Sequence, residues 1–98
     1  MTREEILAIL RKERSGLRSF AVRRLSLFGS TARGEMRAGS DVDILVEFEP
    51  GARVGLFEFV RLQRHLSQLL GLAVDLVTPD ALRPEMRDSI LQEKTDAA

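Results

Sequence analysis

The stretch FGSTARGEMRAGSDVDILVE, residues 28–47, decides the fold of this 98-residue chain. It joins the end of one apolar run to a second run, residues 42–48, whose composition is typical of a β-strand. Asp41 and Asp43 stand two residues apart at the start of that second run. Because successive side chains of a strand alternate between its two faces, both carboxylates point to the same side of the sheet.

Two carboxylates side by side repel each other unless a positive charge lies near them. A divalent metal ion meets that requirement, and Mg²⁺ suits a site of oxygen ligands without His or Cys. In the alternative interpretation, each aspartate is ordinary turn chemistry, with a solvated carboxylate at the start of a strand. The combination of Asp41, Asp43 and a Gly-Ser pair ten residues earlier favours the metal site.

Gly29 and Ser30 lie between the first apolar run and a short helical turn, which we expect from Thr31 to about Met36. Glycine lets the backbone bend sharply and approach a ligand closely. Ser30 stands where an N-cap would, and Arg33 follows three residues later in place of the acidic residue of a capping box. Free N–H groups at a helix N-terminus bind anions, so we expect a phosphate group at this turn.

Asp75 interrupts a third apolar run, residues 72–77, which predicts a short strand. A carboxylate within such a run is costly to bury unpaired, so it lies on a solvated face or faces a cation. Taken alone, Asp75 indicates a solvated face. Two aspartates suited to a metal on a neighbouring strand favour the cation instead.

The rest of the chain predicts four further elements. Thr2 and Glu5 form a capping box ahead of a helix over residues 3–15, which Gly16 ends or bends. The other elements are a strand over residues 20–28 with a solvated start at Arg23 and Arg24, a helix that ends at Gly71, and a last helix that begins at Pro84.

Helical spacing predicts which side chains of the last two helices face the core. They are Leu56, Phe59, Leu62, Leu66, Leu69 and Leu70 in the first, and Met86, Ile90 and Leu91 in the second. His65 is expected to be exposed among polar neighbours, and we assign it no chemistry. The tail, residues 93–98, is polar, and we expect it to be frayed.

This order of elements implies an α/β fold with helices packed on a small sheet of three or four strands. Residues 1–98 form a single domain, because a chain of this length is too short for two cores. Fifteen basic and fifteen acidic residues leave no net charge, and Trp and Tyr are absent, which argues against a direct nucleic-acid partner. The absence of cysteine and of a long apolar run indicates a cytoplasmic protein without a membrane segment.

Gly29-Ser30 followed by Asp41-Val42-Asp43 resembles the signature of the DNA polymerase beta-like nucleotidyltransferase superfamily. The run ARGE, residues 32–35, and the short chain resemble its minimal nucleotidyltransferase (MNT) branch, the antitoxin-type proteins found beside HEPN-domain toxins. The resemblance covers residues 6–91. It implies the mixed sheet of that fold and makes Asp75 the third carboxylate of the site.

We therefore expect Asp41 and Asp43 to hold two Mg²⁺ ions, with Asp75 on the acceptor-side ion and Gly29 with Ser30 on the triphosphate of ATP. The resemblance implies transfer of AMP to a tyrosine hydroxyl of a HEPN toxin. One alternative is an antitoxin that neutralises its partner by contact alone. Another is transfer to a small molecule such as an aminoglycoside, for which a homodimer could supply the acceptor pocket. Arg33 could reach a phosphate or form a surface ion pair.

Overall fold

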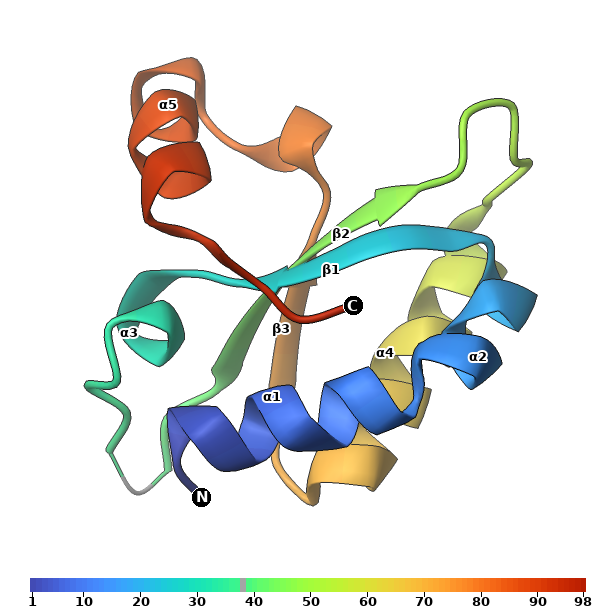
Figure 1. Cartoon of the computed structure of the whole chain (residues 1–98). Coiled ribbons are helices and arrows are strands. Elements are labelled where there is room, and N and C mark those ends of the chain that lie inside the picture. Colours follow the sequence, from blue (N-terminus) through green and yellow to red (C-terminus); the bar gives the residue numbers. More distant parts are fainter. Residues whose placement is uncertain (38) are drawn as a thin grey trace.

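A four-stranded mixed sheet forms the centre of the computed structural model, which describes residues 1–37 and 39–98 (Figure 1). The strand order is β3-β2-β1-β4; β1 is antiparallel to both of its neighbours, and β2 and β3 are parallel. The strands are β1 (Val22–Leu27), β2 (Val42–Phe48), β3 (Val74–Val77) and β4 (Thr95–Asp96). The expected α/β class and mixed sheet are confirmed.

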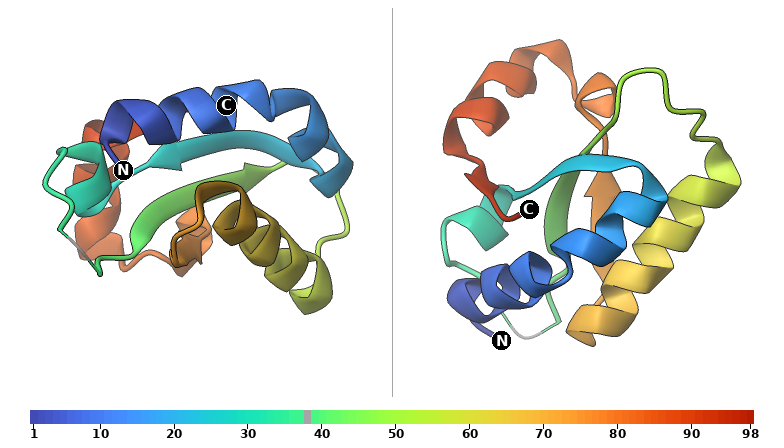
Figure 2. Two further views of the ribbon diagram at one scale, coloured as in Figure 1. Left: turned by 90° about the horizontal axis from the view of Figure 1, so that it is seen from below. Right: turned by 45° about the vertical axis from the view of Figure 1, so that its right-hand side comes forward.

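Helices lie on both sides of this sheet, with α1, α2 and α4 on one side and α5 on the other (Figure 2). They are α1 (Arg3–Lys12), α2 (Arg14–Leu17), α3 (Gly29–Ala32), α4 (Leu56–Leu70) and α5 (Pro84–Glu93), with short 3₁₀ turns η1 (Arg18–Phe20) and η2 (Pro79–Ala81). The range predicted for β2 is confirmed, whereas β1 and β3 are each shorter than predicted. In the described part of the chain, no helix is long and apolar enough to span a membrane.

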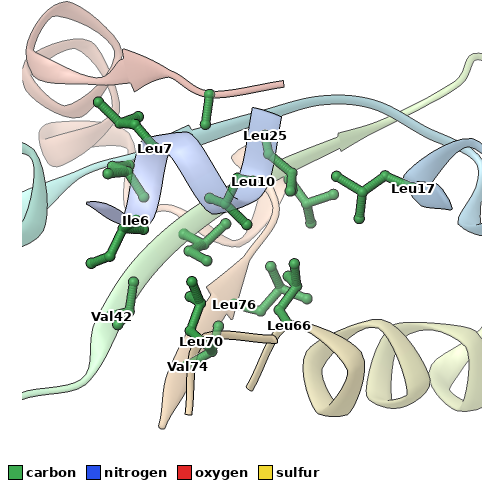
Figure 3. Packing of buried hydrophobic residues seen from close by; sticks show 14 of the residues in the cluster. Ile6, Leu7, Leu10, Leu17, Leu25, Val42, Leu66, Leu70, Val74 and Leu76 are labelled. Carbon is green, nitrogen blue, oxygen red and sulfur yellow. The ribbon is translucent and has the colours of Figure 1, made fainter. Parts of the chain in front are cut away.

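The hydrophobic core lies between the sheet and the helices α1, α2 and α4 (Figure 3). Strand alternation places Val42, Ile44 and Val46 on this face, and all three are fully buried. Helices α1 and α4 cover them from outside. Their fully buried contributions are Ile6, Leu10, Leu62 and Leu66. The apolar face of the sheet is thus closed, and the face that carries Asp43 is left for other contacts.

The first helix begins as predicted and ends early. The hydroxyl of Thr2 accepts a hydrogen bond from the N–H of Glu5 at 3.2 Å, and the Glu5 carboxylate accepts one from the N–H of Thr2 at 3.1 Å. The helix ends at Lys12 instead of Ser15, because Glu13 adopts a non-helical conformation. Gly16 lies inside the next short helix, so the break occurs before the glycine and not at it.

The predictions for α4 are confirmed at its C-terminus and wrong at its start. Gly71 adopts the left-handed conformation, and its N–H donates to the carbonyl of Ser67 at 2.8 Å. Leu56 is 77% exposed because the helix begins away from the sheet (Figure 2). His65 is half-buried, not exposed: its ring stacks on Phe20 with the centroids 5.1 Å apart.

The C-terminal segment, residues 93–98, is not frayed as the sequence predicted. Thr95 and Asp96 form β4 on the free edge of β1, and the Asp96 carboxylate accepts a hydrogen bond from the fully buried hydroxyl of Ser26 at 2.8 Å. Ala97 is only 2% exposed. The prediction considered polarity alone, whereas the unpaired backbone groups of an edge strand also attract any segment that can reach them.

Helix α5 begins at Pro84 as predicted, but two of the three residues predicted to face inward are exposed. Met86 is 49% exposed, Leu91 is 37% exposed, and no residue of the helix is buried. The helix lies on the face opposite α1 and α4 and meets α3 at its end, where Glu93 pairs with Arg33 at 3.4 Å (Figure 2). Met86 and Leu91 therefore remain on the surface, whereas Ile90 is half-buried.

We expect Asp96→Ala to lower the free energy of unfolding by about 1 to 2 kcal/mol, because it leaves the buried Ser26 hydroxyl without its acceptor. Urea denaturation measures this, with the exposed Asp88→Ala as the matched control. Hydrogen bonds from Lys94 and Ser26 lower the pKa of Asp96 in the folded protein. The stabilisation is therefore complete above the unfolded pKa and is lost as the pH falls through the folded one, so the difference between wild type and variant should shrink in acid. If Asp96→Ala and Asp88→Ala lowered the free energy of unfolding equally, the hydrogen bond from Ser26 to Asp96 would not contribute to stability.

Candidate active site

Two of the three predicted carboxylates stand on adjacent strands. The register of the parallel pair β2 and β3 sets Asp43 directly opposite Asp75. Neighbouring strands lie about 4.8 Å apart, and residues in register point to the same face. The open face of the sheet therefore carries both carboxylates side by side. Asp41 lies just before β2, in the segment that enters it.

The electrostatics of Asp43 show that these carboxylates share one region of negative potential. Burial raises the pKa of Asp43 above its ordinary value, and the charges of Asp75 and Asp41 raise it further. The charge of Arg33 acts in the opposite direction and is weaker than each of these effects. Negative charge has thus been concentrated here without an equal compensating charge from the chain.

Helix α3 is bonded directly to the backbone of Asp43. The Asp43 N–H donates to the hydroxyl of Thr31 at 3.0 Å, and the Phe28 N–H donates to the Asp43 carbonyl at 3.1 Å. Thr31 is fully buried. The role of Thr31 is not visible in the sequence, because no pattern in a short helical turn separates a buried threonine hydroxyl from a solvated one.

Gly29 is the first residue of α3, which corrects the predicted start of this helix at Thr31. Phe28 occupies the N-cap position, so Ser30 lies within the first turn and is not the cap. Gly29 has a φ of 58°, and a Cβ atom added there would lie 2.7 Å from Oδ2 of Asp43. A residue without a side chain is needed for the carboxylate and the helix start to come this close.

Arg33 follows α3 and forms two ion pairs on the surface. Its guanidinium lies 3.2 Å from the carboxylate of Glu35 and 3.4 Å from that of Glu93 on α5. Of the alternatives left open by the sequence, the structure shows the intramolecular pair. Arg33 thereby links the end of α3 to α5.

The donor chemistry of this site fits a hard divalent cation. Asp41, Asp43 and Asp75 offer carboxylate oxygens, which Mg²⁺ prefers. Burial and the neighbouring charges of Asp75 and Asp41 raise the pKa of Asp43, so a cation there would stabilise its charged form. Within residues 1–37 and 39–98, no three acidic, His or Cys side chains are grouped closely enough to form a metal site as they stand. An ion held by all three carboxylates would therefore require their oxygens to come closer together than they are in this structure.

The sequence and the fold of this chain both match those of known proteins. The family model described as a nucleotidyltransferase domain matches residues 4–97. A solved structure described as a minimal nucleotidyltransferase superimposes with a TM-score of 0.82 and 38% identity, covering 97% of this chain and 95% of that one. The chain belongs to the minimal nucleotidyltransferase family.

Two further comparisons concern a curated relative and a solved complex. Protein adenylyltransferase MntA of Thermococcus cleftensis is 44% identical over 94 residues, which cover 95% of this chain and 93% of that protein. A Shewanella oneidensis MNT antitoxin, solved in complex with a tri-AMPylated HEPN toxin, matches with a TM-score of 0.64 and 18% identity over 94% of this chain and 71% of that one. At that identity the second likeness shows a shared fold.

We expect Gly29→Ala to be more damaging than Gly34→Ala, although both residues have a positive φ. The added methyl group meets Asp43 Oδ2 at 2.7 Å in the first variant and no atom within 4 Å in the second. Backbone strain alone costs about 1 to 3 kcal/mol at either position, and only Gly29→Ala should also displace the carboxylate. Urea denaturation and calorimetric titration with Mg²⁺ and ATP test both effects. If both variants lost the same stability and the same affinity for Mg²⁺ and ATP, the contact between residue 29 and Asp43 would not matter for either property.

We expect Asp43→Asn to raise the melting temperature in EDTA at neutral pH, because burial and the charges of Asp75 and Asp41 disfavour the charged carboxylate. A folded pKa above the unfolded value means that this charge costs stability near neutrality, and protonation removes the cost as the pH falls. The gain should therefore diminish in acid. Thermal melts from pH 7 downward measure it, with the exposed Asp88→Asn as control. An Asp43→Asn protein that melts below wild type would indicate a structural hydrogen-bonding role instead.

Proposed function

We propose that this nucleotidyltransferase transfers AMP from ATP to a tyrosine hydroxyl of a HEPN-domain toxin and so neutralises that toxin. The observation that carries the proposal is the pairing of Asp43 with Asp75 beside the glycine turn of α3, in a chain 44% identical to a protein adenylyltransferase. The HEPN partner is suggested by the complex of the Shewanella oneidensis antitoxin, whose fold is similar.

The proposed reaction forms one bond and breaks one. The tyrosine oxygen attacks the α-phosphorus of ATP, and the bond from that phosphorus to the α–β bridging oxygen breaks. Pyrophosphate leaves with the electron pair, and the hydroxyl proton passes to the carboxylate of Asp75. Nucleotidyl transfer needs little covalent help from the protein, so alignment and charge neutralisation dominate the catalysis.

Different residues of the chain would hold the metal ions, orient the acceptor hydroxyl and bind the triphosphate. Asp41 and Asp43 would hold Mg²⁺, which supplies charge neutralisation at the phosphates and activates the attacking oxygen when it is bound. Asp75 would orient the acceptor hydroxyl. Gly29 and Ser30 would bind the triphosphate, since N–H groups in the first turn of a helix have no partner within the helix.

A protein acceptor agrees with the surface beside the site. Helix α5 lies on the same side of the sheet as the aspartates and buries none of its residues, and its Met86 and Leu91 are exposed. Apolar side chains on an exposed helix next to a polar site provide a contact surface for a macromolecule. A small acceptor would gain nothing from that surface.

We expect the purified chain, incubated with the HEPN toxin, ATP and Mg²⁺, to add AMP to toxin tyrosine. Mass spectrometry detects the adduct as a mass increase on the modified peptide. Asp41→Asn should abolish it, because the variant loses one of the carboxylates that would hold the ions. Asp80→Asn, an exposed aspartate in η2, removes the same charge outside the site and should leave the adduct in place.

The same variants distinguish catalysis from neutralisation by contact. If wild type and Asp41→Asn silence the toxin equally well and no adduct forms, the chain acts by binding alone. If the adduct forms without ATP-dependent loss of toxin activity, AMP transfer occurs but does not neutralise the partner. Chelation of Mg²⁺ by EDTA should stop adduct formation in the wild-type protein.

A further inference from the structure

The electrically neutral chain carries its charges unevenly. Residues 11–24 contain six basic residues and one acidic residue, whereas the other 84 residues contain nine basic and fourteen acidic ones. The active-site aspartates belong to the acidic part. The molecule therefore has a strongly basic region that the chemistry at Asp43 does not use.

The fold gathers this basic region around one groove of about 770 Å³, which lies between the first two helices, the start of β1 and the C-terminal segment. Five arginines line it. They are Arg11, Arg14 and Arg18 from the helical segment, and Arg23 and Arg24 from β1. Guanidinium groups bind carboxylates and phosphates in a bidentate manner, so the groove is suited to an anionic occupant.

Most of this positive charge is not neutralised within the protein. Arg24 lies 3.7 Å from Glu47 and 3.9 Å from Asp96, and both distances are long for an ion pair. Within the described residues, no carboxylate lies within 4.0 Å of Arg14, Arg18 or Arg23. Three exposed guanidinium groups are thus available to a partner.

The composition of the groove lining favours a protein partner over a nucleic acid. Buried apolar side chains, Leu17, Val22 and Ala97, lie among the arginines, and Glu49 and Asp96 add negative charge. An apolar centre with charges of both signs around it and arginine enriched is typical of protein interfaces. Single-stranded nucleic acids are bound by uniformly basic grooves with aromatic platforms, and none of the described residues that line this groove is aromatic.

We propose that this arginine groove binds an acidic segment of the protein substrate, remote from the reacting tyrosine; this inference rests on the proposed function. Arg23 is six residues before Gly29, which at about 3.3 Å per residue places this arginine roughly 20 Å from the glycine turn of α3. A transferase of 98 residues thereby gains binding energy from a part of the substrate that does not react.

The test is the double variant Arg14→Glu, Arg18→Glu, compared with Arg61→Glu, Arg64→Glu, which makes the same charge change at exposed positions of α4. Affinity for the purified HEPN toxin is measured without ATP by titration calorimetry, and AMP transfer is measured separately. We expect the groove variant to raise both the Kd and the KM for the toxin by about tenfold or more, and to leave kcat within about twofold. The control should match wild type in all three.

Each outcome has a separate meaning. If the groove variant binds the toxin as wild type does, the groove proposal is wrong. If wild type binds the toxin and transfers no AMP, the proposed function fails, while loss of binding in the groove variant still supports the groove. If labelled 12-nucleotide poly(U) binds wild type, and the groove variant loses that binding while keeping the toxin, the groove is a nucleic-acid site. No binding of toxin by wild type overturns both proposals.

Discussion

The parallel pairing of β2 with β3 is the constraint on which the rest of the site depends. It sets Asp43 opposite Asp75, and a shift of one residue in either strand would turn one carboxylate into the core. The apolar residues Val42, Ile44 and Val46 prevent that shift, because it would expose all three. The buried residues on one face of β2 thus fix the position of the carboxylate on the opposite face.

The second element of the site, α3, is held to that strand by backbone and hydroxyl hydrogen bonds. Thr31 accepts from the N–H of Asp43, and Gly29 leaves space for the carboxylate at the helix start. Repulsion among the aspartates opposes this arrangement when no cation is present. The buried contacts of β2 and α3 must therefore offset a local electrostatic cost, as is usual where function and stability conflict.

Sequence reasoning succeeded where a pattern reflects a local physical cause. The alternation of β2, the capping box of Thr2 and Glu5, and the left-handed Gly71 each depend on neighbours within a few residues. Asp75 does lie opposite Asp43, but other predictions that depended on distant segments were wrong. The exposure of Leu56 and of the apolar face of α5 depends on where each helix lies relative to the sheet, and periodicity does not contain that information.

Strand β4 has a consequence for the order in which the chain folds. The bond between Ser26 and Asp96 spans 70 residues, so β1 remains an open edge until residues 95 and 96 have been synthesised. A nascent chain on the ribosome would present the edge of Leu25 and Leu27 to any neighbouring strand during that interval. By pairing with β1, β4 removes an edge at which other chains could aggregate, but it can do so only after residues 95 and 96 have been translated.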